Sequence, residues 1–183
     1  MRILGIDPGS HATGYGVIER DGGRLRHVAH GTLRPQRAAS PELRLAQLYD
    51  AIREVVRHHA PDTVAIERVF VAASPRAALV LGQARGVALA ALGSLGLGAA
   101  EYAPAEIKLS LTGNGRAEKR QVQLVVRRLL ALDRMPEPDA ADALAAAIGH
   151  AQAGALRALG IAPRRGARRP RANLARLRVR RLP

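Results

Sequence analysis

Apolar and polar positions alternate along the first part of the chain in a pattern that predicts strands. An apolar run at residues 2–6 is typical of a buried strand, and residues 14–20 and 25–33 alternate apolar with polar side chains. Between these two stretches, Asp21-Gly22-Gly23 predicts a hairpin turn. Residues 62–66 and 98–102 are interpreted as two further strands. We therefore expect five strands, of which the first three form a meander.

Helical patterns begin at residue 40. Ser40 is interpreted as an N-cap with Pro41 at the first helical position, which predicts a helix that ends before Pro61. Ser74-Pro75 predicts a second helix to about residue 95, and three more are predicted at 105–111, 118–132 and 138–153. In the helix over 118–132, the apolar residues expected to face inward are Val122, Val125, Val126, Leu129 and Leu130. This order predicts an α/β fold, a mixed five-stranded sheet with helices on both faces.

Length and charge suggest one folded domain with a basic extension. The chain has 183 residues, 48% of them hydrophobic, and we expect residues 1–155 to form the domain and 156–183 a basic tail. The net charge is +14, and ten arginines with no acidic residue lie within 154–183. From about Arg164 onward this tail is expected to be flexible. Arg-rich segments bind polyanions by releasing counterions, so nucleic acid is an expected partner.

Several chemistries are excluded by what the sequence lacks. The chain contains no Cys, which excludes disulfides, thiolate zinc sites and a Cys nucleophile. It shows no Ser-His-Asp pattern and no Walker loop. The N-terminal apolar run is too short for a signal peptide, and residues 77–97 contain Gln83, Arg85 and several glycines, which makes a poor membrane span. We expect no membrane partner and a cytoplasmic location.

Four carboxylates are placed for metal chemistry. Asp7 and Glu67 each follow a predicted buried strand, and Asp139 and Asp142 are three residues apart at the start of the last predicted helix, on one face of it. Acids at the ends of neighbouring strands can lie side by side. Grouping them is costly unless a cation is bound, because like charges at close range oppose joint ionisation. Mg²⁺ prefers carboxylate oxygens, and a pair of such ions can drive phosphoryl displacement.

Each acid also has an ordinary structural explanation. Asp7, in Asp-Pro-Gly, is suited to an Asx turn, and Glu67 to pairing with a surface arginine. Asp139 and Asp142 are favoured in a first helical turn by the helix dipole. Sequence alone leaves both explanations open.

Five motifs in order carry a resemblance to a known family. The segments GIDPGSHATGYGVIE, VAIERVF, LGQARGVALA, AEKRQVQLVVRRLLAL and PDAADALAAAIGHA resemble the RuvC family of Holliday-junction resolvases over roughly residues 1–150. The resemblance implies an RNase H-like fold and a homodimeric, Mg²⁺-dependent endonuclease that nicks two strands of like polarity at a four-way DNA junction. It also implies cooperation with a branch-migration helicase complex of RuvA and RuvB.

The resemblance assigns roles residue by residue. It implies that the catalytic, metal-binding carboxylates are Asp7, Glu67, Asp139 and Asp142, although some members have His at the position of Asp139. We expect two Mg²⁺ per site, with Mn²⁺ as a substitute, and cleavage that leaves 5′-phosphate and 3′-hydroxyl ends. Lys119 is expected to support the transition-state charge. The residues expected to contact DNA are Phe70, Arg76, Lys108, Lys119 and Arg120.

Other interpretations remain open at this point. Phe70 is the only Phe in the chain and suits either a core position or stacking on an unpaired base, and both lysines also suit a plain surface role. Small residues in the predicted second helix permit close approach to the sheet or to a partner subunit. One rival function is a non-catalytic nucleic-acid-binding protein. A second is an actin-like or sugar-kinase-like ATPase, which needs two such domains, and 183 residues leave room for only one. A third is an RNase H-like nuclease that acts on RNA or RNA–DNA hybrids.

Overall fold

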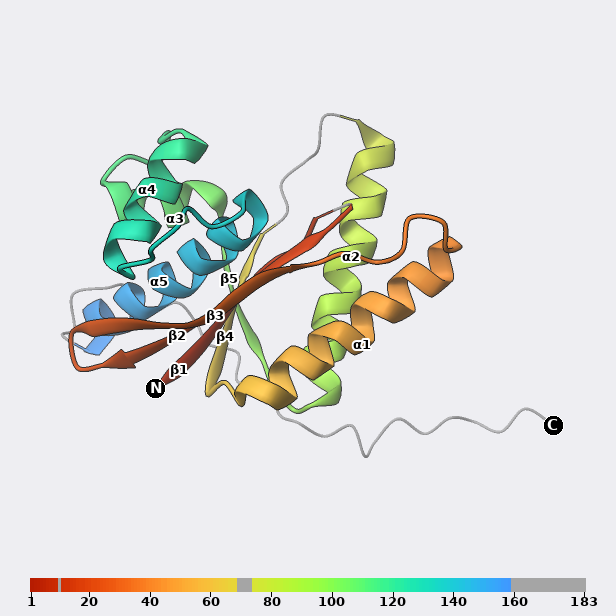
Figure 1. Ribbon diagram of the computed structural model, residues 1–183, viewed down its shortest axis with the longest axis horizontal. Helices are drawn as coiled ribbons and strands as arrows, with labels where there is room; N and C mark the ends of the chain where they lie inside the picture. The colour runs from red at the N-terminus through yellow and green to blue at the C-terminus, as the bar shows by residue number, and fades with distance from the viewer. Residues whose placement is uncertain (10, 69–73, 159–183) are drawn as a thin grey trace.

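A five-stranded mixed sheet forms the centre of the molecule. The structure is a computed structural model that describes residues 1–9, 11–68 and 74–158 (Figure 1). Strands β1 (Arg2–Asp7), β2 (Thr13–Asp21) and β3 (Arg24–Leu33) pair antiparallel, while β4 (Thr63–Glu67) and β5 (Ala99–Tyr102) add in parallel on the other side of β1. The sheet order is β3-β2-β1-β4-β5. The five predicted strands and the meander are confirmed.

Helices cover both faces of this sheet, as the sequence predicted. Figure 1 shows α1 (Pro41–His59) and α2 (Pro75–Ser94) on one side. On the other side lie α3 (Pro104–Thr112), α4 (Lys119–Leu129) and α5 (Pro138–Ala158). The two faces enclose two separate apolar cores, one between the sheet and α1 and α2, and one between the sheet and α3, α4 and α5.

Strand β1 distributes its side chains between the two cores. Leu4 and Ile6 are buried in the core with α1 and α2, whereas Ile3 is buried in the core with α5. Burying each such side chain stabilises the fold by ~1.5–3 kcal/mol. If β1 shifted by one residue against its neighbours, its side chains would exchange the two faces of the sheet. The alternation therefore fixes the register of β1 and places Asp7 on the face that is covered by α5.

Glycines let α5 lie directly against the sheet. A Cβ atom added at Gly5 would overlap the carbonyl oxygen of Ala143, and one added at Gly14 would overlap the carbonyl oxygen of Asp139. Ala and Leu residues on the α5 side fill the contact and are almost fully buried. The close approach therefore holds the first turn of α5 beside the ends of β1 and β2.

Three local predictions need correction. The helix predicted over 118–132 ends at Leu129, because the backbone leaves the helix at Leu130 and enters the left-handed region at Ala131, where φ is 48°. Leu129 was expected to face inward but is 43% exposed, since α4 buries only the stripe that includes Val122 and Val126. Helix α5 continues to Ala158, beyond the predicted end at 153, because a single glycine, Gly154, weakens a helix without ending it.

Helix α2 buries only some of its small residues against the core. Ala84, Ala88 and Ala91 are buried in the core shared with α1, while Gly82 and Ala90 lie on the exposed side. Among the described residues, α2 is the one helix whose length and mean hydropathy of 1.4 would allow it to cross a membrane, a test that core helices also pass.

Candidate active site

Parallel pairing places two carboxylates next to each other at the centre of the sheet. Ile6 of β1 pairs with Ile66 of β4, and the next residue on each strand is Asp7 or Glu67. Because Ile6 and Ile66 both enter the core with α1 and α2, the following residues turn toward α5. The two predicted acids therefore lie at the same end of neighbouring strands and on the same face.

Helix α5 brings two more acids to this place. Asp142 lies in the second turn, where it lines a cleft of about 210 Å³ together with Glu67, Lys108 and Lys119. Asp139, in the first turn, is half-buried and adds to the negative potential at Asp7. The structure thus gathers all four predicted acids around the ends of β1 and β4.

Lys119 supplies a positive charge to the cluster. It is the first residue of α4, and its Nζ lies 2.8 Å from Oδ2 of Asp142. Burial alone would lower the pKa of Lys119, but the hydrogen bond and charge of Asp142, aided by Asp7, raise it. The ammonium remains protonated, and the Lys119 side chain is 58% exposed, so it is accessible from solvent.

The carboxylates resist ionisation in this environment. Burial, followed by repulsion from Glu67 and Asp142, raises the pKa of Asp7 from 3.8 to about 8. Burial and the charge of Asp142 raise the pKa of Glu67 to about 7. The pKa of Asp142 is also raised by burial, although Lys119 opposes the change. Lys119 and the more distant Lys108 do not balance the negative charge of the four acids.

This donor set fits a hard divalent cation. Carboxylate oxygens are the ligands that Mg²⁺ and Mn²⁺ prefer, and a bound cation would relieve the repulsion that raises the pKa values of Asp7 and Glu67. Within the described ranges, no three carboxylates or imidazoles are already arranged as a ligand group. Asp142 is paired with Lys119 instead. Metal binding would therefore require this ion pair to open.

The predicted DNA contacts do not all lie at the carboxylates. Lys108 lines the same cleft as Glu67, and Arg120 is exposed beside Lys119 in the first turn of α4. Arg76, in contrast, lines a different cavity, on the α1–α2 face of the sheet. Phe70 lies outside the described residues.

Two glycines, to which the sequence alone assigned no role, help to build the site. Gly5 and Gly14 bear no functional group, yet they allow α5 to reach the sheet with its aspartates in place. The signal available in the sequence was a glycine within each of two apolar strands, a position that often marks close backbone approach.

The sheet order and the acids at the ends of its central strands define an RNase H-like protein. The family model described as Crossover junction endodeoxyribonuclease RuvC matches residues 3–150. The chain belongs to the RuvC family.

Individual relatives agree with this assignment. The chain is 55% identical over 157 residues to the Crossover junction endodeoxyribonuclease RuvC of Delftia acidovorans, covering 85% of this chain and 86% of the relative. The protein of the same description from Cupriavidus metallidurans is 52% identical over 154 residues, covering 84% and 85%. Thermus thermophilus RuvC superposes with a TM-score of 0.76 at 32% identity, covering 88% of this chain and 98% of that one. The same protein in complex with a Holliday junction substrate gives a TM-score of 0.80 at 31% identity, covering 88% and 97%. The predicted RNase H-like fold is confirmed.

Proposed function

We propose that this chain is an endodeoxyribonuclease that resolves four-way DNA junctions by divalent-metal-dependent hydrolysis of phosphodiester bonds. The observation that carries the proposal is the buried carboxylate cluster at the ends of β1 and β4, in a chain of the RuvC family. The superposition on T. thermophilus RuvC in complex with a Holliday junction substrate supports the choice of substrate.

The carboxylates would hold the metal. Asp7 and Glu67 supply oxygens from the sheet, and Asp142 with Asp139 supplies them from α5. Two Mg²⁺ ions, or Mn²⁺ in their place, would supply Lewis acidity that activates a water and stabilises the departing 3′-oxygen, leaving 5′-phosphate and 3′-hydroxyl ends. The rigid sheet keeps Asp7 and Glu67 fixed relative to each other during this reaction.

Lys119 and Lys108 would act on the phosphate. The Lys119 side chain is 58% exposed, so its ammonium can leave Asp142 and donate hydrogen bonds to a phosphate oxygen as negative charge develops there. Lys108 lines the cleft from α3 and adds a second positive charge. Arg120 extends this basic surface along α4. Phe70 is proposed to stack on a base near the junction centre, and the basic tail to bind DNA non-specifically.

Paired cuts require two sites, and we propose a homodimer built on α2. Leu79 is 71% exposed on this helix, and Gly82, Gly86 and Ala90 continue the same exposed side. A two-fold interface repeats each site once, which suits cleavage of two strands of like polarity. A cytoplasmic location and cooperation with a RuvA–RuvB complex belong to the same proposal.

The direct test is cleavage of a synthetic four-way junction. Wild-type protein with Mg²⁺ should nick the junction in symmetric pairs, and EDTA should stop the reaction. Asp7→Asn and Glu67→Gln should each reduce the rate by about a thousandfold or more, in the range known for loss of essential catalytic groups. Glu54→Gln removes an exposed acid of α1 and serves as the matched control, with an unchanged rate. Full activity in Asp7→Asn would refute the proposed role of the carboxylates.

A further inference from the structure

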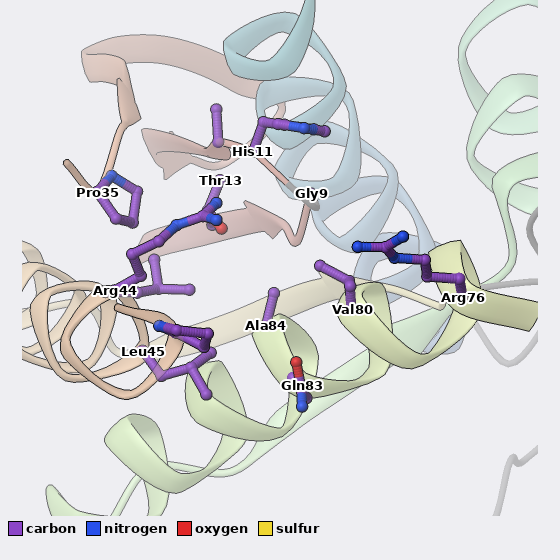
Figure 2. A pocket seen from close by; sticks show the side chains of 13 residues that line it. Gly9, His11, Thr13, Pro35, Arg44, Leu45, Arg76, Val80, Gln83 and Ala84 are labelled. Atoms are coloured by element: carbon purple, nitrogen blue, oxygen red, sulfur yellow. The ribbon is translucent and has the colours of Figure 1, made fainter. Parts of the chain in front are cut away.

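A second cavity lies on the opposite face of the sheet from the carboxylates. It has a volume of about 340 Å³ and is bordered by the β1–β2 loop and by the N-terminal halves of α1 and α2. Figure 2 shows this cavity with the side chains that line it. None of the four acids of the candidate active site is among them.

The lining of this cavity is basic. His11 comes from the β1–β2 loop, Arg44 from α1 and Arg76 from α2, and of the described residues that border the cavity none is Asp or Glu. In Figure 2 the side chains of Arg44 and Arg76 point toward each other across the space. Two arginines and an imidazole from separate elements therefore surround one cavity, which favours an anion.

Two helices flank the cavity with the sides of their N-terminal halves. Helix α1 contributes residues from Pro41 to Leu48, and α2 contributes residues from Arg76 to Ala84. The N-terminal end of a helix carries a partial positive charge, which favours an anion nearby. The dipoles of both helices therefore add to the positive potential of the arginines.

A buried hydroxyl gives independent support for a ligand. Thr13 is 1% exposed and lines the cavity, and its Oγ1 has no hydrogen-bond partner among the residues that the structure describes. Figure 2 labels Thr13 among the side chains around the cavity, near Arg44 and His11 in this view. A buried hydroxyl without a partner costs free energy, and an anion in the cavity would accept its hydrogen bond.

We propose that this cavity, between the β1–β2 loop and the N-terminal halves of α1 and α2, binds a phosphate group. Arg44 and Arg76 would pair with its oxygens, and Thr13 would donate a hydrogen bond. The phosphate comes either from a nucleic-acid backbone that passes the α1–α2 face or from a small phosphate-bearing molecule. The proposal is independent of the catalytic role of the carboxylates, because the two sites share no residue.

The first arm of the test uses inorganic phosphate and the full-length protein in EDTA. Backbone amide NMR shifts near Gly9, His11 and Thr13 should change in a saturable way as phosphate is added. Arg44→Gln should weaken this binding by about tenfold or more, as expected for loss of a hydrogen bond to a charged group. Arg57→Gln removes an exposed arginine near the other end of α1 and is the matched control, with unchanged affinity.

Thr13→Val separates binding from folding. It removes an unpartnered hydroxyl with little change in shape, so the melting temperature without phosphate should stay equal or rise, while phosphate affinity falls about fivefold. A lower melting temperature with unchanged phosphate affinity would assign Thr13 a purely structural role and contradict the proposal.

The second arm distinguishes the two sources of phosphate. Binding of a four-way junction is measured without divalent metal at several salt concentrations. If a backbone phosphate occupies the cavity, Arg44→Gln lowers the slope of log affinity against log salt by about one relative to Arg57→Gln. If Arg44→Gln loses inorganic phosphate but binds the junction like Arg57→Gln, the ligand is a small phosphate-bearing molecule. If neither arm distinguishes the two variants, the proposal is overturned.

Discussion

Replacing Asp7 by Asn should make the metal-free protein more stable and remove its nuclease activity. Burial, with repulsion from Glu67 and Asp142, raises the pKa of Asp7 to about 8 in the folded protein. In the unfolded chain the carboxyl ionises near its ordinary value of 3.8. The folded state therefore holds a proton that the unfolded state has lost. The wild type therefore has its full stability below pH 3.8, the pKa of Asp7 in the unfolded chain. It loses stability as the pH rises from there to about 8, the pKa of Asp7 in the folded protein.

The size of the effect follows from the pKa change. A rise from 3.8 to about 8 corresponds to at most ~5–6 kcal/mol, at about 1.4 kcal/mol per pKa unit. Relaxation and water penetration around buried charges reduce such penalties, so we expect Asp7→Asn to gain ~2–3 kcal/mol at pH 8. At pH 5 the pH is only about one unit above the pKa of Asp7 in the unfolded chain. The stability gained by Asp7→Asn should therefore shrink to ~1 kcal/mol or less.

Urea denaturation in EDTA at pH 5 and pH 8 measures this difference directly. Asp50→Asn, which changes an exposed carboxylate of α1, is the matched control and should leave stability unchanged at both pH values. Mg²⁺ should stabilise the wild type and not Asp7→Asn, because a ligand of the folded state shifts unfolding by mass action. If Asp7→Asn is no more stable than the wild type at pH 8, the electrostatic description of the site is wrong.

Three further predictions test other parts of the account. Gly14→Ala should destabilise the protein by ~2–3 kcal/mol, because its methyl group would overlap the first turn of α5. Gly93→Ala, with open space around it, should instead stabilise the protein by ~0.5–1 kcal/mol. Thermal unfolding measures both changes, and equal stabilities of the two variants would contradict the close contact between α5 and the sheet. Lys119→Gln should lower the single-turnover cleavage rate by about a hundredfold or more with junction affinity reduced only a few-fold, and a purely affinity-based loss would exclude a role in the chemical step. Leu79→Glu should shift the protein to monomer in sedimentation at unchanged stability, and an unchanged dimer would place the interface elsewhere.

The strands and helix starts were predictable because they depend on local signals. Alternation in β1 and β2, and a Pro at the first position of α1 and α2, are properties of a few consecutive residues. Helix ends were less predictable. Leu129 fits the apolar stripe of α4, yet the chain leaves the helix next to it, and Leu130 rather than Leu129 is buried.

The carboxylate cluster was predictable only as a hypothesis. The sequence placed Asp7 and Glu67 after buried strands, but their proximity depends on β1 pairing with β4 across more than fifty residues. Long-range pairing leaves no local signal. The Lys119–Asp142 ion pair depends in the same way on how α4 packs beside α5.

The basic cavity on the α1–α2 face could not be predicted at all. Arg76 was expected to bind DNA, but His11, Thr13 and Arg44 are separated along the chain and belong to no shared motif. Only the folded arrangement brings a loop and the N-terminal halves of two helices together. Burial of the Thr13 hydroxyl without a partner is likewise visible only in three dimensions.

The proposed reaction depends on divalent metal bound by the carboxylates at the ends of β1 and β4 and at the start of α5. Anomalous scattering from crystals soaked in Mn²⁺ locates such ions. We expect Mn²⁺ peaks within coordination distance of Asp7, Glu67 and Asp142, with the Lys119 ammonium displaced from Asp142. Strong Mn²⁺ peaks elsewhere, with the Lys119–Asp142 pair intact and no density between Asp7 and Glu67, would contradict the account.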